Sequence, residues 1–157
     1  MAELDLIDRK IVSELMRDAT QPVAQIADRV GLSQTPCWKR IQKLEASGVL
    51  VRRVAIADPG KLGFDLTVFV GIEAPDHSAE WREAFGKAVE AIPEIMEVYR
   101  MAGEMDYLLR VSVPDMPAYD LLYRKLTDAV AIKNVTSHFA MERMKFTTAY
   151  PVDTRNW

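Results

Sequence analysis

The chain has 157 residues, of which 49% are hydrophobic and 8% aromatic, and its formal net charge is −3. This composition excludes disorder, because it supplies enough apolar side chains for packed cores, and no run approaches the roughly 20 apolar residues of a membrane helix. A single cysteine, Cys37, and two histidines, His77 and His138, exclude an internal disulfide and a structural metal site. No basic and apolar leader begins the sequence, so we expect a cytoplasmic protein without a membrane partner.

Positive charge is concentrated in one short stretch. The first 60 residues hold nine Lys/Arg and eight Asp/Glu, whereas residues 61–157 hold eleven and fifteen. Within residues 33–53 the only acid is Glu45, and the cations there are Lys39, Arg40, Lys43, Arg52 and Arg53. Binding of nucleic acid requires a local basic surface, so any contact with phosphate is expected in this stretch.

Helical spacing of apolar residues marks the start of the chain. It predicts a first helix at residues 5–18, with Asp5 placed to cap it. Pro22 fits the first turn of a short second helix, which Gly31 ends. The first 31 residues are therefore expected to form two helices.

A third helix follows at once, with Ser33 as its expected N-cap and Gly48 as its end. Two helices joined by a short turn, the second of them basic, are typical of a helix-turn-helix, here at residues 23–42. Residues 49–56 are expected to be extended, as a wing and a strand leading out of the domain.

The second half has a different rhythm. The expected elements in order are a strand at residues 67–73, a helix at 81–92, strands at 94–101 and 107–113, a helix capped by Asp115 and a strand at 135–145. The order βαββαβ predicts a ferredoxin-like domain, an antiparallel sheet covered by helices on one face. The chain is thus expected to be α+β, with a winged helix-turn-helix domain and its exit strand at residues 1–58, a linker at 59–66 and the ferredoxin-like domain at 67–157.

The third helix carries the predicted DNA-reading face. On a helical wheel Cys37, Ile41 and Leu44 share one arc, whereas Lys39 and Gln42 point the opposite way. A face of hydroxyl, amide and ammonium groups suits phosphate anchoring and contacts to base edges. The predicted DNA-binding residues are Ser33, Gln34, Thr35, Pro36, Trp38, Lys39, Arg40, Gln42, Lys43, Arg52 and Arg53.

Several of these residues have a structural alternative. Trp38 falls at the edge of the buried arc, where packing at the domain boundary competes with contact to a base. Arg40, at the other edge, is equally suited to an ion pair on the helix surface. A solvated charged helix is the alternative for the whole face. Cys37 lies in the buried arc and is expected to act as a small apolar residue rather than a sensing thiol.

Short motifs in both halves resemble the Lrp/AsnC family, the feast/famine regulators of bacteria and archaea. The resemblance covers almost the whole chain. The matching pieces are Leu6-Ile7-Asp8-Arg9-Lys10-Ile11, Val30-Gly31-Leu32-Ser33, residues 35–41, Leu44-Glu45, Ser47-Gly48, residues 103–107, residues 113–116, Met141-Glu142 and Lys145. It implies transcription regulators that bind double-stranded DNA as homodimers, formed largely through the C-terminal sheets, and that associate further into octamers or similar assemblies.

More narrowly, residues 36–40, 77–81, 100–104 and 137–142 are similar to a cysteine-responsive branch of that family. This likeness implies a small amino acid as effector, with L-cysteine as the leading candidate and no other cofactor. Amino-acid binding between dimers is then expected to change the assembly or the placement of the DNA-binding units.

The resemblance places the effector site in the loop between the second and third strands of the sheet. There Gly103 allows backbone N–H groups to approach a carboxylate, and Asp106 offers a counter-charge to an ammonium group. A solvated hairpin turn is the alternative, and Met116 is equally suited to ordinary packing. The predicted effector-binding residues are Met101, Ala102, Gly103, Glu104, Asp106, Tyr107, Met116, Ser137 and Phe139.

Two other classes of protein compete with this interpretation. An architectural DNA-binding protein would need a broad basic surface, which the acidic second half does not offer. Some relatives with the two-domain plan are sirohaem decarboxylases, but neither histidine here lies beside a catalytic motif. We therefore predict no catalytic residues and no enzyme activity.

Overall fold

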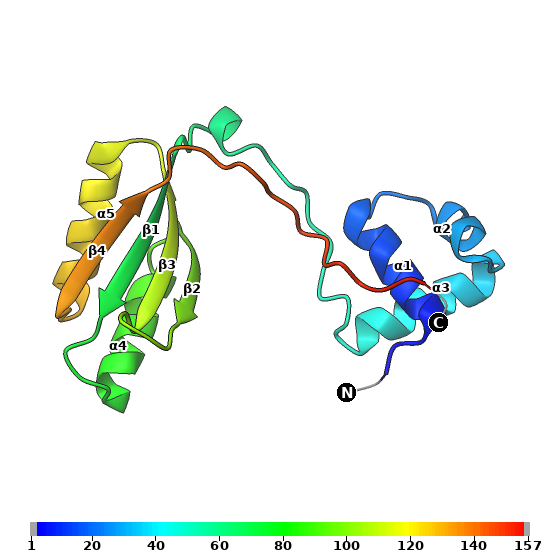
Figure 1. Ribbon diagram of the computed structural model, residues 1–157, viewed down its shortest axis with the longest axis horizontal. Helices are drawn as coiled ribbons and strands as arrows, with labels where there is room; N and C mark the ends of the chain where they lie inside the picture. The colour runs from blue at the N-terminus through cyan, green and yellow to red at the C-terminus, as the bar shows by residue number, and fades with distance from the viewer. Residues whose placement is uncertain (1–2, 156–157) are drawn as a thin grey trace. The chain divides into compact units, whose positions relative to one another are not determined.

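The structure, a computed structural model, describes residues 3–155, which form two compact units. Residues up to 55 group with residues from 144 onward, and residues 56–143 form the second unit (Figure 1). Each unit encloses its own hydrophobic core. The two units are described separately below.

Three helices build the first unit, as the spacing predicts. They are α1 (Leu6–Arg17), α2 (Val23–Val30) and α3 (Gln34–Ala46). Each contributes one fully buried isoleucine to the core, namely Ile11, Ile26 and Ile41. Asp5 caps α1 through its carboxylate, which accepts the N–H of Asp8 at 2.8 Å.

The turn between α2 and α3 depends on a glycine. Gly31 has φ +76°, and both its N–H and the N–H of Leu32 reach the carbonyl of Ala27. A side chain would strain this left-handed backbone. Ser33 occupies the N-cap position of α3, as predicted, but its hydroxyl makes no capping hydrogen bond.

The predicted wing and exit strand are wrong for this structure. Residues 49–58 contain no strand, and Val51, Val54 and Ile56 are exposed. The apolar, β-branched residues favour an extended chain, but a strand also requires a neighbour for its backbone groups. The described part of this unit contains no other strand, so the segment stays unpaired.

The second unit has the predicted ferredoxin-like order. It runs β1 (Leu66–Glu73), α4 (Ala79–Glu90), β2 (Ile95–Arg100), β3 (Tyr107–Val113), α5 (Met116–Ala129) and β4 (Asn134–Phe139). The strands are antiparallel in the order β2-β3-β1-β4. A short 3-10 turn, Gly60–Leu62, lies in the predicted linker before β1.

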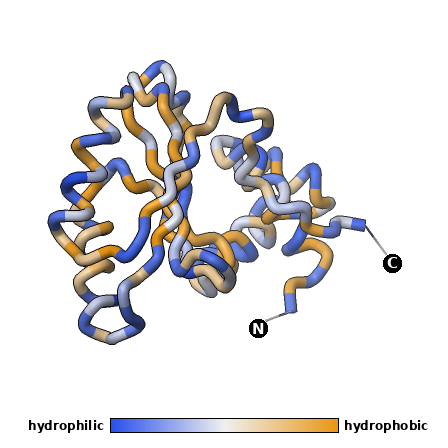
Figure 2. The backbone as a smooth tube through the Cα atoms, turned by 60° about the vertical axis from the view of Figure 1, so that its left-hand side comes forward, coloured by the Kyte–Doolittle hydropathy of each residue, from blue (hydrophilic) through white to orange (hydrophobic). Residues whose placement is uncertain are grey.

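The two faces of the sheet differ. Val68, Val70 and Ile72 of β1 lie in the core that α4 and α5 cover. Many residues along the sheet are hydrophobic, as the orange stretches in Figure 2 show. Side chains on the other face alternate with these core residues. This helix-free side, called the open face below, carries Thr67, Phe69, Gly71, Glu97, Tyr99, Leu108, Arg110, Thr136 and His138.

The last strand is shorter than the predicted 135–145. The N–H of Ala140 still reaches the carbonyl of Thr67 at 3.0 Å, but β1 begins at Leu66, so residues beyond 140 find no neighbouring strand. Residues 144–155 group instead with the first unit, and Val152 is half-buried there. Hydrogen bonds from Arg155 are the main cause that lowers the pKa of Asp153, and the charge of Arg9 on α1 lowers it further. The predicted boundary of the second domain at residue 157 therefore differs from the packing.

Candidate nucleic-acid interface and effector site

Helix α3 has the two faces that its sequence predicts. Cys37, Ile41 and Leu44 are buried against α1 and α2. This packing fixes the rotation of the helix and sends Lys39 and Gln42, together with Thr35 and Lys43, to the exposed side. Among residues 3–155 no ion pair engages Lys39 or Lys43, so both ammonium groups are available to phosphate.

The N-terminus of α3 adds an anion-attracting end to this face. Ser33, Gln34, Thr35 and Pro36 are all exposed, and the first turn contains no acid. Free N–H groups and the helix dipole favour a negative group at such an end. Hydroxyl and amide side chains therefore surround a position that suits a DNA phosphate.

Arg40 departs from the predicted DNA contact and takes the structural alternative. Its guanidinium donates to Asp5 at 2.6 Å and to Asp8 at 2.8 Å, which ties α3 to the start of α1. The N–H of Asp8 and then Arg40 hold the pKa of Asp5 below its ordinary value, while both acids raise the pKa of Arg40. Arg40 thus positions the helix rather than presenting a free charge.

The remaining cations and the tryptophan behave differently from one another. Arg53 pairs with Glu45 at 2.9 Å, whereas Arg52 is exposed and has no ion-pair partner within residues 3–155. Trp38 is 50% exposed, so its ring is not part of the first unit's core. Of the predicted basic residues, Lys39, Lys43 and Arg52 keep a free charge.

The single cysteine is a core residue. Cys37 has no exposed surface, and burial raises the pKa of its thiol, with Arg40 opposing this only in part. A protonated and inaccessible thiol is a poor nucleophile. The geometry supports the predicted apolar role.

Backbone hydrogen bonds close the predicted effector loop into a compact turn. The N–H of Met101 donates to the carbonyl of Asp106 at 2.8 Å. Asp106 is also fastened to β1, because its N–H donates to the Ile72 carbonyl and its Oδ2 accepts the N–H of Ala74, each at 2.8 Å. Within residues 3–155 its Oδ1 has no hydrogen-bond partner.

The exposed part of this loop is short. Met101, Ala102, Gly103 and Glu104 are exposed, and Gly103 has φ +137°, which a side chain would rarely adopt. The carboxylate of half-buried Asp106 therefore uses one oxygen to organise the loop, whereas the other has no hydrogen-bond partner within residues 3–155.

Tyr107 belongs to the core rather than to the exposed loop. Its ring centroid lies 4.7 Å from that of Phe85 and 5.7 Å from that of Trp81. The indole Nε1 of Trp81 in turn donates to the carbonyl of Ala131 at 2.6 Å. The ring predicted to contact the effector therefore packs against core side chains.

Three other predicted effector residues lie elsewhere in the same chain. Ser137 shares a hydrogen bond with the hydroxyl of Tyr119, and Phe139 meets the Tyr119 ring edge-on, whereas Met116 is 53% exposed at the start of α5. Phe139 aligns with Val111, four residues along β3 from Tyr107, or about 13 Å at strand spacing. One chain therefore does not bring Met116, Ser137 and Phe139 together with the predicted effector residues of the loop at 101–107.

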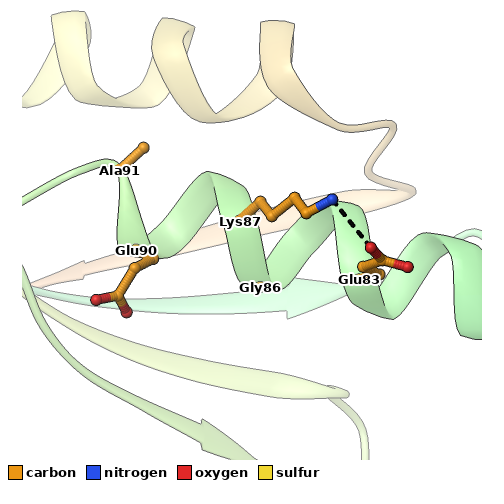
Figure 3. A pocket seen from close by; sticks show the side chains of 5 residues that line it. All are labelled: Glu83, Gly86, Lys87, Glu90 and Ala91. Atoms are coloured by element: carbon orange, nitrogen blue, oxygen red, sulfur yellow. Dashed lines mark hydrogen bonds and ion pairs between the residues drawn. The ribbon is translucent and has the colours of Figure 1, made fainter.

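Neither hollow found in the second unit includes a predicted effector residue. One, of about 550 Å³, is shallow and lies on α4, where Glu83, Gly86, Lys87, Glu90 and Ala91 line it and Lys87 pairs with Glu83 at 2.9 Å (Figure 3). Another, of about 400 Å³, lies between the end of α5 and the start of β4. The loop residues alone thus form an open surface in the single chain.

Two kinds of feature are absent from residues 3–155. These residues contain no cluster of three or more His, Cys, Asp or Glu side chains that could hold a metal ion. None of their helices is long and apolar enough to cross a membrane.

Comparison with known proteins gives full-length matches. The Lrp/AsnC ligand binding domain matches residues 67–150, and the AsnC-type helix-turn-helix domain matches residues 4–45. The DNA-binding transcriptional activator DecR of Escherichia coli is 46% identical, over 96% of this chain and 99% of that protein.

Solved structures agree with these matches. An AsnC family transcriptional regulator from Agrobacterium tumefaciens is 51% identical with a TM-score of 0.91, covering 94% of this chain and 97% of that one. A transcriptional regulator from Neisseria meningitidis in complex with L-Met is 28% identical with a TM-score of 0.89, covering 96% of this chain and 98% of that one.

Proposed function

This chain belongs to the Lrp/AsnC family of DNA-binding transcription regulators, and we propose that an amino acid controls its binding to DNA through α3. The full-length relative at 46% identity is a transcriptional activator, which favours a regulator over the sirohaem decarboxylase alternative. The observation that carries the proposal is the exposed face of α3, which is fixed in rotation by buried Cys37, Ile41 and Leu44. Such a face fits the major groove.

The residues of this face divide into two roles. Gln42 reads a base edge, since its amide can donate to and accept from adenine, and Lys39 contacts guanine or an adjacent phosphate. Lys43, Arg52 and the N-terminus of α3 anchor phosphates and set the register. Arg40 contributes by holding α3 against α1 rather than by touching DNA.

The second unit binds the effector at the loop of residues 101–106. Backbone N–H groups around Gly103 meet the carboxylate of the amino acid, and Oδ1 of Asp106 meets its ammonium group. The likeness of residues 36–40 and 137–142 to a cysteine-responsive branch favours L-cysteine, whereas the L-Met complex of a relative keeps methionine as the second candidate.

The complete effector site is formed between copies of the chain. The open loop surface and the separation of Met116, Ser137 and Phe139 from Asp106 support this arrangement. Exposed Phe69 and Tyr99 on the open face support a homodimer formed through the sheets, which associates further into octamers or similar assemblies. Residues 1–58 serve DNA, residues 59–66 link, and residues 67–143 serve effector binding and assembly, in a cytoplasmic protein; residues 144–155 pack with the DNA-binding unit.

Calorimetric titration with each proteinogenic amino acid tests the effector, in a reducing buffer that keeps cysteine a thiol. We expect saturable heat with one amino acid or a few, and its loss in Asp106→Asn. Asparagine can still accept the N–H of Ala74, so only the charge changes. Asp120→Asn, on the exposed side of α5, is the matched control.

DNA binding of the same proteins completes the test. Asp106→Asn should bind DNA as the unmodified protein does without effector but no longer respond to the amino acid. Absence of heat with every amino acid would refute amino-acid control and leave the DNA-binding role intact. Equal affinity for selected and random DNA would favour the architectural alternative instead.

A further inference from the structure

Met105 occupies the place of a missing side chain in the sheet. Gly71 lies on β1, where it pairs with Leu108 of β3 and Thr136 of β4. A Cβ atom at Gly71 would lie 3.2 Å from Met105 Sδ and 3.3 Å from its Cε. The thioether therefore fills the volume above Gly71, on the open face.

Two sets of contacts attach the effector loop to the sheet. Asp106 makes the first set, through its hydrogen bonds with the backbone of Ile72 and Ala74. Met105 makes the second set, through its side chain against Gly71. Met105 is half-buried, whereas its neighbour Glu104 is exposed. Met105 is thus the side chain that joins the exposed loop to the open face.

The contact lies in one row of open-face residues. Tyr99, Leu108, Gly71 and Thr136 follow one another across β2, β3, β1 and β4. Tyr99 is 53% exposed at one end of the row. Any displacement of the Met105 thioether changes the surface above Gly71, in the middle of this row. Leu108 of β3 and Thr136 of β4 are the neighbouring side chains there.

We propose that Met105 is the positioning residue that transmits occupancy of the loop to the open face. This inference rests on the proposed function, in which an amino acid binds at residues 101–106. The bound carboxylate orders the backbone of Gly103 and Glu104, and Met105 follows next in the chain. An unbranched thioether can adopt a second position at little cost, and a side chain at residue 71 would prevent the first position.

The test uses the full-length protein and a glycine pair. Gly71→Ala adds a methyl group where Met105 lies, Met105→Ala removes the thioether, and the double variant shows whether the two act through one contact. Gly86→Ala is the matched control, because nothing lies within 4 Å of a Cβ at that position on α4. The probes are L-cysteine and L-methionine, titrated separately by calorimetry and in DNA-binding assays on a selected DNA site.

We expect Gly71→Ala and Met105→Ala to bind the amino acid but to lose most of its effect on DNA affinity, a reduction of about fivefold or more in the coupling factor. The double variant should be no worse than Met105→Ala, and DNA binding without amino acid should stay unchanged in all. Full coupling in both single variants would overturn the inference, and so would a parallel loss of effector-free DNA binding, which indicates a structural role.

Failure of amino-acid control and failure of the role of Met105 give different results in these assays. Should the unmodified protein give no heat with either probe, amino-acid control by these ligands fails and the inference fails with it. Should the unmodified protein bind and respond while both single variants respond equally, only the role of Met105 fails. The behaviour of Gly86→Ala separates either result from a general effect of adding a methyl group.

Discussion

The Arg40→Gln variant tests whether Arg40 holds the recognition helix in place or contacts DNA. The change removes the two charge-assisted hydrogen bonds that link α3 to Asp5 and Asp8. Glutamine retains part of the aliphatic chain, so packing changes little. The expected result is therefore a loss of stability in the first unit without a change in the number of phosphate contacts.

The magnitude follows from the exposure of the two acids. Asp5 is 53% exposed, and solvent screening limits a pair of this kind to about 0.2–1 kcal/mol. Asp8 is 16% exposed, and a hydrogen bond to a charged group in such a position contributes about 1.5 kcal/mol. The variant should lose about 1.7–2.5 kcal/mol, which corresponds to roughly 20- to 70-fold faster amide exchange where exchange follows opening of the unit.

Hydrogen exchange measured by mass spectrometry resolves the two units. Peptides from α1 and α3 should exchange faster in Arg40→Gln, whereas peptides from β1 and β3 provide the internal standard. Lys39→Gln is the control on the same helix and should leave exchange unchanged. Its slope of log affinity against log salt should fall by about 1, as expected for one lost phosphate contact.

The pH dependence has a defined sign. The pKa of Asp5 in the folded chain lies below its ordinary value of 3.8, so its stabilisation is complete above that value and is lost as the pH falls through the lower, folded pKa. The difference between Arg40→Gln and the unmodified protein should persist from neutral pH to about pH 5 and shrink as the pH falls below 3.8. Unchanged exchange together with a reduced salt slope in Arg40→Gln would show that Arg40 contacts DNA and that this reasoning is wrong.

The remaining predictions concern the base-reading residue, the thiol and the open face. Gln42→Ala should lower affinity for a selected DNA site by about 1–3 kcal/mol and leave affinity for random DNA nearly unchanged in competition assays; an equal loss on both would assign Gln42 to phosphate. Cys37 should react with Ellman's reagent only after urea unfolding, because burial raises the pKa of its thiol; rapid reaction of the folded protein would contradict this. Phe69→Asp should convert dimers to monomers in analytical ultracentrifugation, since it places a charge on the proposed interface; an unchanged mass would move the interface elsewhere.

Much of the fold is predictable because local patterns and packing agree. The strand at residues 107–113 is predicted to the residue, since its alternating apolar side chains face one core. Gly31 ends α2 as predicted, because the left-handed turn has a local chemical signal. These elements require no information from distant parts of the chain.

The errors arise where the structure of a segment or the contact of a side chain depends on a distant part of the chain. Residues 49–56 carry strand-forming residues and residues 141–145 directly follow the end of β4, but whether either segment becomes a strand depends on a partner that the described chain does not place beside it. Sequence spacing also left open whether Arg40 pairs with acids 32 and 35 residues away. Met105 escaped prediction for the same reason, since only the sheet register brings it above Gly71.

An acidic chain can bind DNA here because ion pairing sorts the cations of the first unit. Arg17 and Arg29 pair with Glu14, Arg40 with Asp5 and Asp8, and Arg53 with Glu45. The acids thus neutralise structural arginines and, on α3 and the segment after it, leave Lys39, Lys43 and Arg52 for phosphate, which gives a salt slope of only about −2.7 for one copy. A dimer that places both α3 helices on DNA doubles this to about −5.4. A measured slope near −3 on a selected site would mean that one unit binds alone, and the symmetric arrangement proposed above would then be wrong.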